Sequence, residues 1–156
     1  MKLFTKLAPL ALCLVAACAG TGTDSNTSSA LPHGEWIGNN EDMDQVVRFA
    51  VVDANPSEFY DRTIWVEANA YAVCKKMQCW MQIEDEGHWA TVRWDSGCGG
   101  SYKFPEDAVG GRVVVQGDLY PKELTEEQIA ALEQAGKPVP AEPYEFNVTA
   151  VMVVED

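Results

Sequence analysis

Residues 63–85 read TIWVEANAYAVCKKMQCWMQIED and contain two apolar segments, 63–74 and 79–85, separated by four residues. In both segments apolar side chains recur at alternate positions, as they do in half-buried β-strands. Four residues is a common length for the loop of a β-hairpin. The stretch therefore predicts a hairpin whose core-facing side carries Ile64 and Val66.

Further apolar segments lie on both sides of this hairpin. They are separated by turn-forming residues, among them Asn55-Pro56 and the glycine-rich run 96–101. The domain is therefore predicted to be mainly β. The expected strands are residues 45–52, 89–95, 112–120 and 145–155, with a short strand at 102–104 and one helical turn at 57–60.

One helix is well specified, and it precedes the last expected strand. Thr125 can cap its first turn, and Gln128 can reach back to complete a capping box. Leu124 and Ile129 flank this cap as a hydrophobic staple, and Gly136 ends the helix. Several strands with one helix before the last strand predict a small OB-like five-stranded barrel, and a small β-sandwich is the competing architecture.

The N-terminus has the pattern of a bacterial lipoprotein signal. A start carrying Lys2 and Lys6 precedes an apolar run, residues 7–17, that is too short to span a bilayer as a helix. The run ends in LVAAC at residues 14–18, which resembles a lipobox. We therefore expect a signal peptide over residues 1–17 and a lipid on Cys18. An ordinary secretory signal with an incidental cysteine is the competing interpretation.

A lipid on Cys18 predicts an exported protein that its acyl chains hold at a membrane. Ala19 follows the cysteine, where an aspartate would indicate retention at the inner membrane, so the outer membrane facing the periplasm is favoured. Residues 18–35 are polar enough to form a flexible tether behind the lipid. Residues 36–156 are then expected to form a single OB-like β domain.

The composition is strongly acidic, with 24 acidic and 11 basic residues and a net charge of −13. Loss of the signal peptide would remove Lys2 and Lys6, leaving 9 basic residues and a net charge of −15. Nucleic-acid binding depends mainly on neutralising phosphates, so this balance argues against a nucleic-acid partner. It also means that the lipid, and not a basic patch, must hold the protein at a membrane.

The two cysteines of the hairpin, Cys74 and Cys79, are expected to pair with each other. Residues directly opposite in an antiparallel pair have α-carbons about 4.5–5.5 Å apart, which a disulfide tolerates. An exported protein meets an oxidising compartment, so a disulfide is the default state. The loop it closes is short, so its entropic stabilisation is small, and both a structural and a redox role stay open. The expected strand pairs are Ala70 with Ile83 and Ala72 with Met81.

Cys98 is the odd cysteine, in a glycine-rich loop at residues 97–100. An unpaired cysteine in an exported protein suggests a reactive thiol, an intermolecular bond or a metal ligand. Soft sulfur ligands suit copper(I) above other biological metals. A copper site is therefore one candidate, with ligands drawn from Cys74, Cys79, Cys98, Met77, Met81 and His88.

Thiol–disulfide exchange through Cys74 and Cys79 is the alternative chemistry. Lys75 and Lys76 are expected to lower the pKa of a neighbouring thiol. The spacing is nevertheless wider than C-x-x-C, and no thioredoxin-like pattern surrounds it. The chain also lacks the common hydrolase motifs, so no catalytic residue is predicted. A non-enzymatic binding or structural module is favoured, with a small ligand, a metal or an envelope protein as its partner.

Two further groups of residues allow more than one interpretation. The carboxylate run Glu84-Asp85-Glu86 is expected to form a solvated turn. Four tryptophans in the expected strands either line a ligand surface or pack into the core, and packing is the commoner use. These tryptophans are Trp65, Trp80, Trp89 and Trp94.

The chain resembles domain of unknown function 4920, a grouping of bacterial lipoproteins. The segments that carry the resemblance are TIWVEA at 63–68, VCKK at 73–76, CWM at 79–81, FPED at 104–107 and GRVVVQG at 111–117. The likeness extends over about residues 51–155, and the cysteine–tryptophan hairpin is its specific part. It implies a small OB-like β domain with a Cys74/Cys79 pair and no established activity. Members have glycine where this chain has Gln78.

Overall fold

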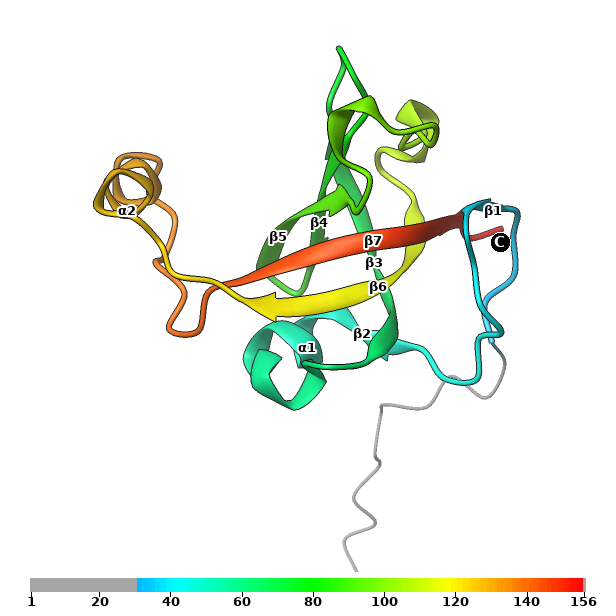
Figure 1. Cartoon of the computed structure of the whole chain (residues 1–156), viewed down its shortest axis with the longest axis horizontal. Helices are drawn as coiled ribbons and strands as arrows, with labels where there is room; N and C mark the ends of the chain where they lie inside the picture. The colour runs from blue at the N-terminus through cyan, green and yellow to red at the C-terminus, as the bar shows by residue number, and fades with distance from the viewer. Residues whose placement is uncertain (1–30, 156) are drawn as a thin grey trace, which may run out of the picture.

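The computed structural model describes residues 31–155 and is built around a closed five-stranded β-barrel (Figure 1). Going around the barrel, β3 pairs with β4, β4 with β5, β5 with β7, β7 with β6, and β6 again with β3. Of these five pairings, only that of β5 with β7 is parallel. The OB-like barrel predicted from the sequence is confirmed. The strands are β3 (Thr63–Val73), β4 (Trp80–Asp85), β5 (His88–Trp94), β6 (Arg112–Pro121) and β7 (Tyr144–Val153).

Two short strands lie outside the barrel. β1 (Trp36–Gly38) pairs with β7, and β2 (Val47–Arg48) runs parallel to β3. After β2 the chain turns into α1 (Phe49–Ala54) and the 3-10 turn η1 (Pro56–Phe59), which contact the barrel strands (Figure 1).

The strand expected at residues 45–52 is therefore wrong over most of its length. Phe49 and Val52 are three residues apart, so a helix turns both toward the barrel, and both are fully buried. The buried carboxylate of Asp85 accepts the Ala50 N–H, one of the donors that helix α1 leaves unpaired in its first turn, at 3.0 Å. The apolar run that predicted a strand at residues 45–52 is thus equally compatible with a short helix.

The second helix, α2 (Glu126–Gln134), lies between β6 and β7 as the sequence predicts. Its capping box forms: the Gln128 N–H donates to Thr125 Oγ1 at 3.3 Å, and the Thr125 N–H donates to Gln128 Oε1 at 3.0 Å. None of its residues is buried, and it stands away from the barrel (Figure 1). No helix of residues 31–155 is long and apolar enough to cross a membrane.

The barrel interior is filled by the alternate residues of its five strands. Trp94 and Phe104 stack inside it with ring centroids 4.5 Å apart. No strand forms at residues 102–104, but Phe104 is fully buried and its N–H donates to Gln78 O at 2.9 Å. Two further 3-10 turns, η2 (Gly97–Gly99) and η3 (Glu106–Ala108), connect β5 to β6.

A β-bulge at Tyr71 interrupts the pairing of β3 with β4. Ala70 lies opposite Ile83 as predicted, but Ala72 lies opposite Gln82 instead of Met81. One extra residue in β3 reverses the direction of every later side chain in that strand. Val73 therefore points into the core, opposite Met81, and Cys74 does not.

Candidate functional site

The structure corrects the expected cysteine pairing: Cys79 is bonded to Cys98, and Cys74 is a free thiol. The bulge explains the correction, because it sets Cys74 opposite Trp80, whose carbonyl accepts the Cys74 N–H at 3.0 Å. Cys79 keeps the core-facing direction and is buried, and Cys98 reaches it from the exposed turn η2. The three cysteines lie at one end of the barrel, where β3 ends and β4 begins.

The Cys74 thiol lies inside the loop that connects β3 to β4. The Met77 N–H donates to its sulfur at 3.5 Å. This bond, with help from the N–H groups of Lys76, Gln78 and Cys79, lowers the pKa of the Cys74 thiol, and desolvation opposes it only in part. A lowered thiol pKa near lysines was predicted, but its cause is the loop backbone and not the ammonium groups.

The loop is held in this shape by contacts of its own. Gln78 has a φ of 52°, in the left-handed region that favours glycine. This explains why glycine suits the position, and here Gln78 adopts it with its N–H bonded to Cys74 O at 2.9 Å. The Gln78 side chain donates to Glu106 at 2.8 Å, and Lys103 Nζ donates to Met77 O at 3.2 Å. The thiol is therefore presented by an ordered loop.

The six expected copper ligands do not come together in the described structure. Met81 is fully buried in the core, and Met77 is in the exposed loop. His88 lies at the other end of β4 and β5, about 17 Å along the strands from the cysteines. Its Nδ1 is 2.8 Å from Asp53 Oδ2. Within residues 31–155 no three His, Cys, Asp or Glu side chains are arranged to hold a metal ion.

Asp53 joins His88 to the start of β7. The Tyr144 hydroxyl donates to Asp53 Oδ1 at 2.7 Å, on the other oxygen of the same carboxylate. Burial, reinforced by this hydrogen bond, raises the pKa of Tyr144, so the phenol stays protonated and acts as a donor. These contacts fasten α1 to the barrel.

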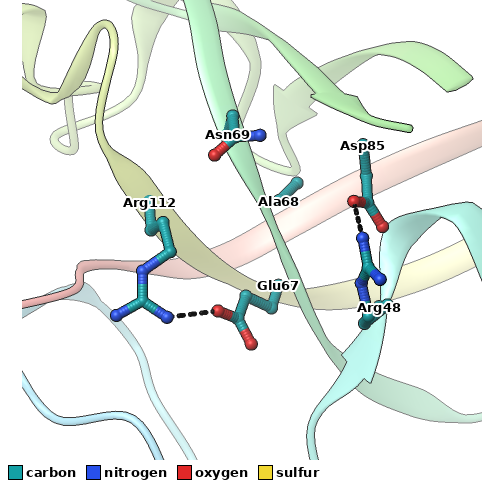
Figure 2. Close-up of a pocket in the computed structure, with 6 residues that line it drawn as sticks. All are labelled: Arg48, Glu67, Ala68, Asn69, Asp85 and Arg112. Atoms are coloured by element: carbon teal, nitrogen blue, oxygen red, sulfur yellow. Dashed lines mark hydrogen bonds and ion pairs between the residues drawn. The ribbon is translucent and has the colours of Figure 1, made fainter. Parts of the chain in front are cut away.

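A pocket of about 260 Å³ lies between β2, β3 and β6 (Figure 2). Two ion pairs occupy its wall: Arg48 with Asp85, and Arg112 with Glu67 at 2.9 Å. Asp85 is buried, which corrects the expectation that residues 84–86 form a solvated turn. Since each guanidinium already faces a carboxylate, the pocket offers no unbalanced charge to a ligand. Its lining residues are Arg48, Glu67, Ala68, Asn69, Asp85 and Arg112.

The outer surface of β3, β4 and β5 adjoins the end of the barrel that carries the three cysteines. Cys74 shares this outer side with Trp80, because the two residues face each other across the bulged hairpin. Tyr71 and Trp89 are 58% and 44% exposed, and their rings meet edge to face with centroids 4.5 Å apart. Trp94 is in the core, and Trp65 donates to Gln116 at 3.1 Å. Trp89 and the half-buried Trp80 thus lie on the outer side of the sheet, whereas Trp94 packs in the core.

Sequence reasoning missed Tyr71 and Arg93 as members of this surface. For Arg93 a signal was available, because residues 89, 91 and 93 alternate with Ala90, Val92 and Trp94. For Tyr71 the same kind of signal was available, because it alternates with the core-facing Ile64, Val66, Ala68 and Ala70; only the residues after the bulge change direction.

Removing the disulfide should destabilise the domain. Cys98→Ser is best made together with Cys74→Ser, so that Cys79 has no new partner. The bond spans 19 residues, and a loop of that length predicts a loss of about 3 kcal/mol in the free energy of unfolding. Urea unfolding would measure it. Cys74→Ser alone is the control and should change stability by less than about 0.5 kcal/mol. A double variant as stable as that control would contradict the pairing.

No protein-family model matches this chain, and no curated protein matches it. One solved structure that it resembles is described as a "putative aspartyl-tRNA synthetase from Leishmania major Friedlin". The identity is 13% and the TM-score is 0.45, over 74% of this chain and 23% of the other. The chain therefore spans about a quarter of that protein's length.

Proposed function

We propose that this chain is an exported lipoprotein, anchored through lipid on Cys18, whose barrel exchanges thiols and disulfides in the cell envelope. The lipobox supports the anchor, and Cys18 lies outside the described residues. The observation that carries the chemistry is the Cys74 thiol, which lies in an ordered loop that donates a backbone N–H to its sulfur. In an oxidising compartment an accessible free thiol beside a disulfide is well placed for exchange.

The reaction would start at the Cys74 sulfur. Its thiolate attacks one sulfur of a partner's disulfide, a mixed disulfide forms, and the partner's other sulfur leaves as a thiolate. The attacking form is the thiolate, so a lowered pKa increases the reactive fraction near neutral pH. Cys79 and Cys98 are already bonded to each other and do not compete for the partner.

A copper(I)-binding module is the second candidate. It rests on the soft sulfur atoms of Cys74, Cys79 and Cys98, which reduction of the disulfide would turn into three thiols; in the described residues they are not arranged as a metal site, so copper binding would require the loops that carry them to move. Metal analysis of the reduced lipoprotein after exposure to copper(I) separates the candidates. Stoichiometric copper that is lost in Cys74→Ser would favour the binding module, and reduced protein without copper would exclude it.

The pH dependence of alkylation tests the proposed exchange. The rate at which iodoacetamide modifies Cys74 should rise with pH and level off above the thiol pKa. Because the loop lowers this pKa, the midpoint should lie below that of the same cysteine in urea-unfolded protein. Mass spectrometry of the peptide carrying Cys74 would follow the reaction. A midpoint equal to or above the unfolded value would contradict the proposal.

A further inference from the structure

Cys79 lies between two residues that hydrogen-bond to the backbone of Cys74. The Gln78 N–H donates to Cys74 O at 2.9 Å, and Trp80 O accepts the Cys74 N–H at 3.0 Å. The Met77 N–H contributes most to the lowered pKa of the Cys74 thiol, and the Cys79 N–H contributes as well, which places the Cys74 sulfur beside the Cys79 backbone. The free thiol and one half of the disulfide are therefore neighbours at the foot of the same loop.

The two halves of the disulfide lie in different environments. Cys79 is buried, at 3% exposure, whereas Cys98 is exposed in turn η2. Gly97 and Gly99 flank Cys98, and an added Cβ on either glycine would meet open space. A thiolate released at Cys98 would face solvent, whereas one released at Cys79 would be a buried charge, which costs free energy. Attack on the Cys79 sulfur, with Cys98 as the leaving group, is therefore the favoured direction of any exchange within this cluster.

We propose that the Cys79–Cys98 disulfide is itself a substrate of Cys74, so that the three cysteines relay a reactive thiol from the loop to turn η2. This inference rests on the proposed thiol–disulfide exchange and assigns two further cysteines to it. The Cys74 thiolate attacks the Cys79 sulfur, a Cys74–Cys79 disulfide forms, and the Cys79–Cys98 bond breaks with its electron pair on the Cys98 sulfur. No oxidant or reductant is needed, because one thiolate and one disulfide are present before and after.

Contacts of the loop control the relay. The side chain of Cys79 faces the core and that of Cys74 does not, so the loop must shift before the two sulfurs meet. Two contacts with the segment after turn η2 oppose this shift: Gln78 donates to Glu106 at 2.8 Å, and Lys103 Nζ donates to the loop carbonyl of residue 77 at 3.2 Å. The resting protein therefore keeps the Cys79–Cys98 bond, and local opening of the loop starts the relay.

The chain entropy does not oppose the relay. A Cys74–Cys79 disulfide closes a shorter loop than the Cys79–Cys98 bond, which spans 19 residues, and the entropic cost of closing a loop grows with its length. The native fold is thus what favours the longer bond. After the relay the free thiol is Cys98, on an exposed turn that a bulky partner reaches more easily than the inside of a loop.

Dithiodipyridine provides the test, because it transfers one thiopyridine group to whichever cysteine carries the thiol and releases thiopyridone. Full-length protein with its disulfide intact is treated at mildly alkaline pH, where the thiolate forms, with reagent from equimolar amounts to a large excess. Acid stops the reaction, and iodoacetamide blocks any remaining thiol. Trypsin then separates the three cysteines, and mass spectrometry locates the thiopyridine label and the remaining disulfide.

We expect the label on Cys74 when the reagent is in large excess, because it captures that thiolate before the loop opens. At low reagent concentration the label should shift to Cys98, with Cys74 linked to Cys79. Glu106→Ala removes one loop contact and should increase the share of label on Cys98 at every concentration. Glu133→Ala is the matched control, because Glu133 is an exposed glutamate of α2, and it should leave the share unchanged. Cys74→Ser should lose the Cys98 label completely.

Three outcomes would count against one proposal or the other. Label confined to Cys74 at every reagent concentration would overturn the relay and leave the proposed exchange standing. Label on Cys98 in Cys74→Ser would also overturn the relay, because the disulfide would then open without Cys74. No label on any cysteine of the wild-type protein would instead overturn the proposed exchange itself. The failures of the two proposals are therefore distinguishable.

Discussion

Replacing Cys74 by serine should abolish the reaction of the natively oxidised protein with disulfide reagents. Cys79 and Cys98 are bonded to each other, which leaves Cys74 as the one free thiol of residues 31–155. A serine hydroxyl stays protonated near neutral pH and cannot form a disulfide. Thiopyridone release from dithiodipyridine measures the effect, and the expected rate of Cys74→Ser is the background rate.

Cys98→Ser provides the comparison for this prediction. It breaks the disulfide and frees Cys79 but does not change Cys74. We therefore expect Cys98→Ser to keep the reaction with dithiodipyridine. If Cys74→Ser keeps the wild-type rate while Cys98→Ser loses it, then Cys98 carries the reactive thiol and our assignment of Cys74 is wrong.

Trp94→Ala should produce the largest loss of stability of any single change discussed above. Trp94 is 2% exposed and its ring stacks on Phe104 with centroids 4.5 Å apart, so its contribution comes from packing. Truncating a fully buried tryptophan typically costs about 3–5 kcal/mol, because transfer energy is lost and a cavity remains. Urea unfolding followed by far-ultraviolet circular dichroism would measure the change.

Trp89→Ala is the control for Trp94→Ala, since Trp89 lies in the same strand, β5, but on its outer side, and is 44% exposed. It loses its edge-to-face contact with Tyr71, so we expect a cost below about 1.5 kcal/mol. Equal losses in the two variants would mean that Trp94 is not packed inside the barrel.

The parts of the fold that the sequence predicted correctly are those with a regular local pattern. The alternation in residues 63–70 and 79–85 is sufficient to define two strands and their buried side, because a strand has a period of two. The helix α2 was predicted from Thr125 and Gln128, since a capping box is a contact within one turn. Both signals depend on residues close together in the chain.

The parts of the fold that could not be predicted depend on the insertion of a single residue into a strand or on hydrogen-bond partners far away in the sequence. The bulge at Tyr71 inserts one residue, and nothing in the alternation of residues 71–74 indicates it. The change of register it causes is what separated Cys74 from Cys79 and left Cys98 as the partner. In the same way α1 begins where it does because Asp85, 35 residues away, accepts a hydrogen bond from Ala50.

Disulfide mapping of the native protein tests the central claim most directly. Free thiols are blocked with iodoacetamide before digestion with trypsin, which cuts after Lys75, Lys76, Arg93 and Lys103 and so separates the three cysteines. We predict a linked pair of peptides 77–93 and 94–103, and an alkylated Cys74 in peptide 63–75. A link between peptides 63–75 and 77–93, with alkylated Cys98, would contradict our account.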